Sequence, residues 1–224
     1  MNGKLFVIDG TDGSGKQTQF NKLVEHLEKE NIPFKKLSFP RYDNPSSSLV
    51  KMYLAGEFGK NAKDISPYVA STFFAVDRYA AYKQDFEQYY KKGGLVLADR
   101  YTTANMVHQA GKIYNKKERD KFLNWLCDFE YNIFGIPKPT ETFFLNMPPD
   151  YATKLIENRE NKITHKIEKD IHEKDKKHIV DSYNAACDLA LKYNWFEIKC
   201  VKDGSIRTID DIHNEIFEEI KKHI

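Results

Sequence analysis

A glycine-rich loop near the N-terminus does most to limit the folds open to this chain. Residues 10–17 read Gly-Thr-Asp-Gly-Ser-Gly-Lys-Gln, and they lie between an apolar run at 5–8 and an amphipathic helical pattern at 20–27. A strand, a G-x-x-x-x-G-K loop and a helix in this order are typical of a phosphate-binding loop. The glycines let backbone N–H groups converge, and the helix N-terminus adds partial positive charge. The pattern therefore predicts an α/β fold with a phosphate site at this loop, in preference to a chance turn.

Every residue of the loop is a candidate for nucleotide binding. Lys16 supplies a mobile positive charge for the terminal phosphates. Gln17 departs from the motif, which places Ser or Thr there as a magnesium ligand, and Thr18 lies about 100° further round the helix. We therefore expect Mg²⁺ to be held mainly by nucleotide phosphates, water and a carboxylate. The candidate residues are Gly10, Thr11, Asp12, Gly13, Ser14, Gly15, Lys16, Gln17 and Thr18.

The rest of the chain alternates strand-like apolar runs with helical patterns. Alternation of this kind predicts a parallel sheet that is covered by helices on both faces. We expect one domain, 1–224, with a five-stranded parallel sheet in a three-layer P-loop NTPase sandwich. The predicted strands are 4–8, 34–39, 95–98, 142–145 and 195–200.

Composition narrows the classes of partner. The net charge of the 224 residues is only +2, which gives no reason to expect a nucleic-acid or membrane partner. The sequence has no apolar stretch of 18 residues, and it opens on a strand pattern in place of a signal peptide. Three cysteines without C-x-x-C spacing fit reduced thiols. We expect a cytoplasmic protein.

The segment 158–178 differs in character from the rest. It carries seven Lys or Arg, five Asp or Glu and three His, with few apolar positions. The simplest interpretation is a solvated, mobile segment. In a protein with a phosphate-binding loop it has a second use, because a basic segment after the fourth strand can close over the phosphates as a lid.

Charged residues follow two of the predicted strands. The sequence Asp99-Arg100-Tyr101 follows the run 95–98, and Phe39-Pro40-Arg41 ends the second strand. Ligands of parallel α/β sheets bind beyond the carboxyl ends of the strands. A carboxylate there suits magnesium, and a guanidinium suits phosphate. The alternatives are a structural ion pair at Asp99 and a surface arginine at Arg41.

A third cluster lies in the helical pattern before the third strand. Phe74 and Arg78 are four residues apart, so they share one face of a helix. An aromatic ring with a neighbouring guanidinium suits a nucleobase. The alternative is a core phenylalanine beside an exposed arginine.

Taken together and in chain order, these clusters resemble the thymidylate kinase family, the P-loop enzymes that phosphorylate dTMP with ATP. The resemblance runs from Leu5 to about Leu191. The matching positions are the loop with its acid Asp12, Phe39-Pro40-Arg41, the pair Phe74 and Arg78, Asp99-Arg100-Tyr101, and Leu145 through Pro149 leading to Arg159. The resemblance implies ATP with Mg²⁺ as donor, dTMP as acceptor and a homodimer.

The resemblance also implies residue roles. Lys16 would bind the ATP phosphates, Asp12 would lie beside the dTMP phosphate, and Asp99 would hold the metal directly or through water. Arg100 would bind the dTMP phosphate and bridge to the γ-phosphate. Arg159, at the lid entrance, would reach the donor nucleotide or the transferring phosphoryl group. These assignments make Lys16, Asp12, Arg100 and Arg159 the catalytic candidates.

For the acceptor, the resemblance implies that Phe74 stacks on thymine while Arg78 and Asn105 contact its edge. Arg41 would share the phosphate with Arg100. The candidate dTMP-binding residues are Asp12, Phe39, Arg41, Phe74, Arg78, Arg100, Tyr101, Asn105 and His108.

Several positions depart from the family pattern. Ala104 stands where many members have Ser, and His108 replaces an aromatic residue that abuts the deoxyribose in several members. In the lid, lysine replaces arginine at Lys166, and lysine cannot make the planar two-pronged contact of arginine. These departures bear on base and sugar selectivity more than on the reaction type.

Two rival functions remain open from the sequence. One is a kinase for another nucleoside monophosphate or for a deoxynucleoside, in which Asp9 or Asp12 would take the proton of the 5′-hydroxyl. The other is an ATP-gated binding module with no second substrate. The surplus of phosphate-seeking residues at strand ends favours a kinase with a phosphate-bearing acceptor.

Overall fold

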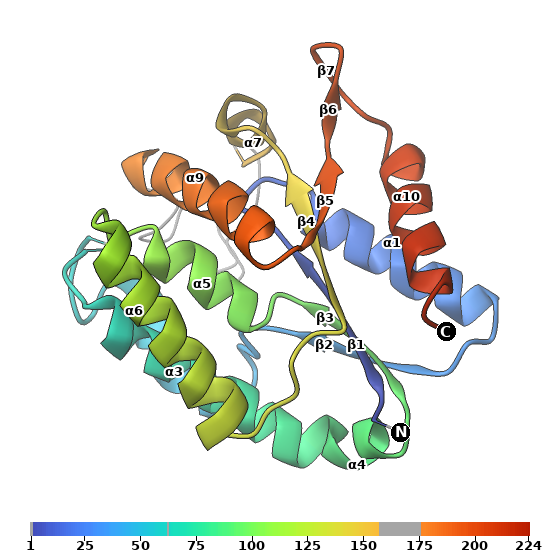
Figure 1. Ribbon diagram of the computed structural model, residues 1–224, viewed down its shortest axis with the longest axis horizontal. Helices are drawn as coiled ribbons and strands as arrows, with labels where there is room; N and C mark the ends of the chain where they lie inside the picture. Colours follow the sequence, from blue (N-terminus) through green and yellow to red (C-terminus); the bar gives the residue numbers. More distant parts are fainter. Residues whose placement is uncertain (1, 62, 157–175) are drawn as a thin grey trace.

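The computed structural model describes residues 2–61, 63–156 and 176–224. Its centre is a five-stranded parallel sheet in the order β2-β3-β1-β4-β5, as the sequence predicts (Figure 1). The strands are β1 (Lys4–Asp9), β2 (Phe34–Ser38), β3 (Leu95–Asp99), β4 (Glu141–Asn146) and β5 (Phe196–Lys199).

Helices cover both faces of this sheet, so the three-layer prediction is confirmed (Figure 1). Helices α1 (Lys16–Lys29) and α10 (Ile209–Lys221) pack on one face. The other face carries α3 (Pro67–Ala81), α5 (Thr102–Ala110) and α9 (Lys176–Lys192), with α6 (Lys116–Cys127) outside them. The described residues also form the α-helices α2 (Ser48–Ala55), α4 (Glu87–Lys91) and α7 (Pro149–Ile156) and a short 3-10 helix at Pro45–Ser47.

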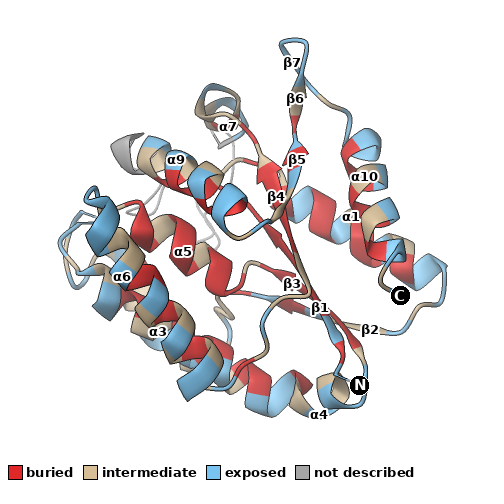
Figure 2. Ribbon diagram, viewed as in Figure 1, coloured by how far each residue is buried: buried red, intermediate tan, exposed pale blue. Residues whose placement is uncertain are grey.

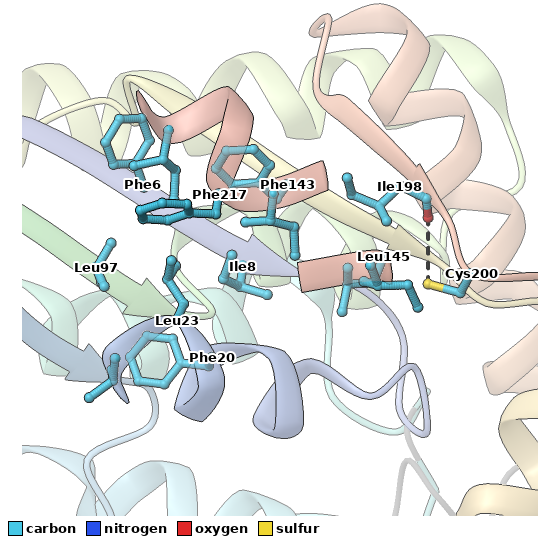
Figure 3. Packing of buried hydrophobic residues seen from close by; sticks show 14 of the residues in the cluster. Phe6, Ile8, Phe20, Leu23, Leu97, Phe143, Leu145, Ile198, Cys200 and Phe217 are labelled. Atoms are coloured by element: carbon cyan, nitrogen blue, oxygen red, sulfur yellow. Dashed lines mark hydrogen bonds between the residues drawn. The ribbon is translucent and has the colours of Figure 1, made fainter. Parts of the chain in front are cut away.

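Successive side chains of each strand point to opposite faces, and both faces are buried. Phe6 and Ile8 of β1 pack with Leu23 and Phe217 on the side of α1 and α10, whereas Val7 packs on the opposite side (Figure 3). Buried residues follow the strands and the helix faces turned toward them (Figure 2). The three central strands β1, β3 and β4 consequently read as nearly continuous apolar runs, whereas the edge strands β2 and β5 carry polar residues as well.

Smaller elements escaped prediction. A two-stranded antiparallel hairpin, β6 (Val201–Lys202) and β7 (Ser205–Ile206), extends from the end of β5. Its turn places Asp203 and Gly204 at φ of 50° and 75°, a conformation that Gly and Asp tolerate. Two π-helical segments, Tyr82–Phe86 and Asp128–Ile133, follow α3 and α6.

Two expectations from composition can be compared with the described residues. No helix in that part of the chain is long and apolar enough to cross a membrane. All three cysteines are free thiols, and Cys200 is buried while Cys127 and Cys187 are partly exposed.

A pair of histidines joins α1 to α10. His26 Nδ1 and His213 Nε2 lie 2.7 Å apart, and His26 stacks on Phe217 with 3.7 Å between ring centroids. Burial, together with the neighbouring His26 and Lys22, lowers the pKa of His213 from its ordinary 6.5 to about 4, against an opposing effect of Asp210. His213 is therefore neutral in the folded protein at neutral pH.

We expect the free energy of unfolding to fall as the pH drops from 6.5 toward 4. In that range the unfolded chain binds a proton at His213 that the folded protein does not bind. The loss should reach about 1–3 kcal/mol and level off below about pH 4. Urea unfolding across this range measures it. A His213→Leu variant should show a shallower pH dependence, and an equally steep one would contradict the assignment.

Candidate active site

The glycine loop wraps the start of α1 in a backbone that glycine alone adopts without strain. Gly15, the residue before the helix, has φ of +83°, in the left-handed region. At Gly10, with φ of +155°, an added Cβ would lie 2.7 Å from Ser14 Oγ and 2.9 Å from the carbonyl oxygen of Leu145. The loop therefore has the close-packed form of a phosphate cradle at the carboxyl end of β1.

A cavity of about 360 Å³ opens above this loop. It is lined by residues from the loop, from the ends of β2 and β3, and from α3 and α5. Most of the predicted site residues line it: Asp12, Gly13, Ser14, Gly15, Lys16, Gln17, Thr18, Phe39, Phe74, Arg78, Asp99, Arg100, Tyr101, Asn105 and His108. Gly10, Thr11 and Arg41 are not among the lining residues, and Arg159 lies outside the described residues.

The side chain of Lys16 folds back over its own loop. Its Nζ donates to the carbonyl oxygen of Thr11 at 2.7 Å and approaches Ser14 Oγ at 3.5 Å. Burial and the nearby charge of Arg100 lower the pKa of Lys16 to about 7, although Asp12 and other carboxylates work in the opposite direction. An anionic phosphate in the cavity would favour the charged ammonium, so Lys16 is suited to a ligand that arrives with negative charge.

Arg100 lies at the centre of the cavity wall. Its φ of +64° is unusual for a residue other than glycine, and its backbone N–H donates to Ile8 at 3.1 Å. Its guanidinium forms an ion pair with Asp12 and donates to His108 Nε2 at 2.9 Å. Burial acts to lower the pKa of Arg100, but carboxylates led by Asp12 raise it above its ordinary value. The cavity therefore keeps a permanent cation beside the glycine loop.

Two buried carboxylates lie beneath these cations. Asp99, at the end of β3, accepts a hydrogen bond from Ser38 Oγ at 3.2 Å. Asp9, at the end of β1, accepts from the backbone N–H of Gly10 at 2.8 Å and from Thr103 Oγ1. Burial raises the pKa of Asp9. The hydrogen bonds fix Asp9 as a support for the loop, while Asp99 lines the cavity.

The protein side chains at the cavity could supply only some of the ligands of a magnesium ion, so nucleotide phosphates and water would have to supply the others. Among the described residues no group of three or more His, Cys, Asp or Glu side chains could hold a metal ion. Gln17, at the position after Lys16, donates from Nε2 to Asn21 Oδ1 at 3.0 Å. Mg²⁺ usually takes one or two carboxylates and completes its octahedron with phosphates and water. Asp99 and Asp12 at the cavity wall are compatible with that arrangement.

Comparison with known proteins agrees with this geometry. A family model described as thymidylate kinase matches residues 8–214. The chain belongs to the thymidylate kinase family. Thymidylate kinases phosphorylate dTMP to dTDP, so the sequence-based predictions of family, enzyme class and family reaction are confirmed.

Individual relatives cover nearly the whole chain. The thymidylate kinase of Plasmodium falciparum is 29% identical over 98% of this chain and 90% of its own length. The thymidylate kinase of Fervidobacterium nodosum is 26% identical over 98% of this chain and 100% of its own. A solved thymidylate kinase structure from Candida albicans superimposes with a TM-score of 0.73 at 20% identity, covering 99% of this chain and 92% of that one. The last likeness shows the fold.

The thymidylate kinase pattern leads us to expect Arg41 at the acceptor phosphate, but the structure holds its side chain elsewhere. Nε donates to Asp77 at 3.1 Å, and Nη1 donates to Asp85 at 2.6 Å. Asp77 is 1% exposed and also accepts from the backbone N–H of Arg41 at 2.8 Å. Because these carboxylates satisfy the guanidinium, its predicted phosphate contact stays a prediction that requires the ion pairs to open.

Phe74 and Arg78 lie together on the cavity wall, as the family pattern predicts. The ring of Phe74 rests edge-to-face against Tyr53, with 6.1 Å between centroids and 88° between planes. Arg78 is 2% exposed and is bound to Glu130, so it is not the exposed arginine of the alternative interpretation. Glu130 was missed by the sequence analysis. The one available signal was an acid within the aromatic sequence Phe129-Glu130-Tyr131.

Proposed function

We propose that this chain transfers the γ-phosphoryl group of ATP to dTMP, giving dTDP and ADP. The observation that carries the proposal is the single cavity that joins the glycine loop to the Phe74 wall, with Arg100 between them. A cavity lined by a phosphate loop and by an aromatic wall suits two nucleotides that meet at their phosphates. In this reaction Lys16 would bind the phosphates of ATP, and Phe74 would stack on the thymine of dTMP.

Alignment and charge neutralisation are what such a reaction asks of the protein. The acceptor phosphate is already anionic at neutral pH, so its oxygen attacks the γ-phosphorus in line without a general base. Lys16 and Arg100 line the same cavity and would offset the negative charge of the phosphates. Arg159, in the predicted lid 158–178, is proposed to add a third cation. That segment lies outside the described residues except for its last three positions, which begin α9.

Magnesium belongs to this proposal as the ion that accompanies ATP. Asp99 would hold it directly or through water, and Asp12 lies on the same cavity wall. When bound, the ion would neutralise charge on the β- and γ-phosphates. Gln17 lines the same cavity, and its Nε2 donates to Asn21 on the next turn of α1.

We also propose a single-domain cytoplasmic homodimer without nucleic-acid or membrane partners. The homodimer is supported by an apolar strip on the outer side of α3. The residues of this strip are each between 39% and 48% exposed: Tyr68, Val69, Val76 and Tyr79. Helix α3 lies beside α6 on the outside of its layer (Figure 1). Exposed apolar side chains that follow one helix face are typical of a subunit interface.

The choice of acceptor separates this function from the nucleoside kinase alternative. ADP release is measured with dTMP or with thymidine as the only acceptor. We expect turnover with dTMP and none with thymidine. In the proposed site Arg100 holds the acceptor through its phosphate, and thymidine has no phosphate. Turnover with thymidine alone would favour a nucleoside kinase in which Asp9 or Asp12 takes the proton of the hydroxyl.

Replacing Phe74 by alanine should weaken dTMP binding by about 1–3 kcal/mol, the usual scale of stacking between a base and an aromatic ring. The ring lines the cavity and is supported by Tyr53, so its removal leaves the base without a platform. Calorimetric titration with dTMP measures the change. Phe73 is the matched control, since it neighbours Phe74 in α3 but does not line the cavity. Equal losses in both variants would contradict the stacking role.

A further inference from the structure

Glu130 is a buried charge that the roles proposed above leave unused. It lies on the π-helical segment Asp128–Ile133 and its side chain is 0% exposed. A carboxylate buried this completely needs partners that compensate for the loss of water. Two of its partners, Arg78 and Asn105, line the cavity, so Glu130 lies directly behind the cavity wall.

The carboxylate grips Arg78 with both oxygens. Arg78 Nε donates to Oε2 at 2.6 Å, and Nη2 donates to Oε1 at 2.6 Å. Thr102 Oγ1 adds a third hydrogen bond, to Oε2 at 2.8 Å. A two-pronged contact of this kind fixes the plane of a guanidinium as well as its position.

The grip also decides which atom Arg78 can offer to a ligand. Nε and Nη2 are engaged by Glu130, and among the described residues Nη1 donates no hydrogen bond. Arg78 lines the cavity one helical turn after Phe74. A base stacked on Phe74 would therefore meet one fixed N–H donor in place of a freely rotating guanidinium.

We propose that Glu130 is a positioning residue that sets base selectivity through Arg78. Guanidinium nitrogens only donate hydrogen bonds. The 4-carbonyl of uracil or thymine accepts such a bond, whereas the 4-amino group of cytosine is itself a donor. A guanidinium locked in place cannot turn away from the amino group, so cytosine is rejected more strongly than by a mobile arginine. The inference rests on the proposed placement of the acceptor base on Phe74.

Asn105 extends the same arrangement. Its Nδ2 donates to the carbonyl oxygen of Ser71 at 3.2 Å and approaches Glu130 Oε1 at 3.5 Å. These contacts turn the amide so that its oxygen is the atom left for a ligand. An acceptor beside the fixed donor of Arg78 matches the N3–H next to the 4-carbonyl of uracil and thymine. Cytosine presents the reverse pattern.

The test compares dUMP with dCMP, which differ in their rings only at this edge. Dissociation constants for both, and for ATP, are measured by calorimetry in the wild type and in Glu130→Gln. The wild type should bind dUMP more tightly than dCMP. In Glu130→Gln the ratio of the two constants should shrink at least tenfold, while ATP binding changes less than twofold. Glu215→Gln, which breaks an arginine–glutamate pair away from the cavity, should leave the ratio unchanged.

A purely structural role for Glu130 predicts something different: the melting temperature would fall while the dUMP to dCMP ratio stayed the same, and that result would overturn the proposal. A wild type without preference between the two nucleotides would also overturn it. If Glu130→Gln does not fold, Thr102→Val decides, since it removes one hydrogen bond to Glu130 and leaves every charge in place. In that variant the preference for dUMP over dCMP should fall severalfold, and an unchanged preference would overturn the proposal. Failure of the wild type to bind dTMP at all would instead refute the proposed function.

Discussion

Replacing Lys16 by alanine is expected to lower kcat at least about a hundredfold while the protein keeps its fold. The hydrogen bonds of its ammonium go to Thr11 and Ser14 in its own loop, so the sheet and its helices do not depend on them. Its ammonium would stabilise charge that develops on the transferring phosphoryl group, and one such contact contributes at least about 3 kcal/mol. Steady-state ADP release measures the change, and circular dichroism reports the fold.

Lys22→Ala provides the control for Lys16. Lys22 lies on the same helix, pairs with Asp210 at 2.6 Å and does not line the cavity. It should retain near-normal turnover. A folded Lys16→Ala variant with normal kcat would remove the assignment of the glycine loop as the ATP phosphate site.

Replacing Arg100 by alanine should lower kcat/KM for dTMP about a hundredfold to a thousandfold. This corresponds to a loss of about 3–4 kcal/mol of transition-state stabilisation. The change removes a cation from the cavity wall together with the ion pair that it forms with Asp12. The repulsion between that carboxylate and the acceptor phosphate adds to the lost attraction. Steady-state kinetics with dTMP varied at saturating ATP measure both parameters.

Arg100→Lys separates geometry from charge. Lysine keeps the positive charge but loses the fork that reaches Asp12 and His108 together, so it should recover only part of the activity. Arg119→Ala, which removes a surface pair with Asp188, is the control for loss of an arginine. If Arg100→Ala changed the KM for ATP and left that for dTMP unaltered, the two substrate sites would have been exchanged in this account.

Local patterns were enough to predict the sheet and the loop. The central strands β1, β3 and β4 are nearly continuous apolar runs, and the Gly10–Lys16 motif needs only its neighbours in the chain to adopt its form. Residues at strand ends were predictable for a related reason, because parallel strands bring their carboxyl ends to one edge. That rule alone places Asp99 and Arg100 beside the loop.

Partners that are distant in sequence could not be predicted in this way. Glu130 is 52 positions from Arg78, and Asp77 is 36 positions from Arg41. No periodicity links such residues, and only the folded packing decides which carboxylate meets which guanidinium. For Arg41 the sequence predicted a phosphate as the anionic partner, whereas in the structure its guanidinium pairs with the carboxylates of Asp77 and Asp85.

If the cavity brings ATP and dTMP together for phosphoryl transfer, dTMP should be the preferred acceptor in a screen of monophosphates. ADP release from ATP is measured with each of the four deoxynucleoside monophosphates and with UMP, and the phosphorylated product is identified by chromatography. We expect the fastest turnover with dTMP and dTDP as the product. No ADP release above background with dTMP, or faster turnover with dCMP or dAMP, would contradict it.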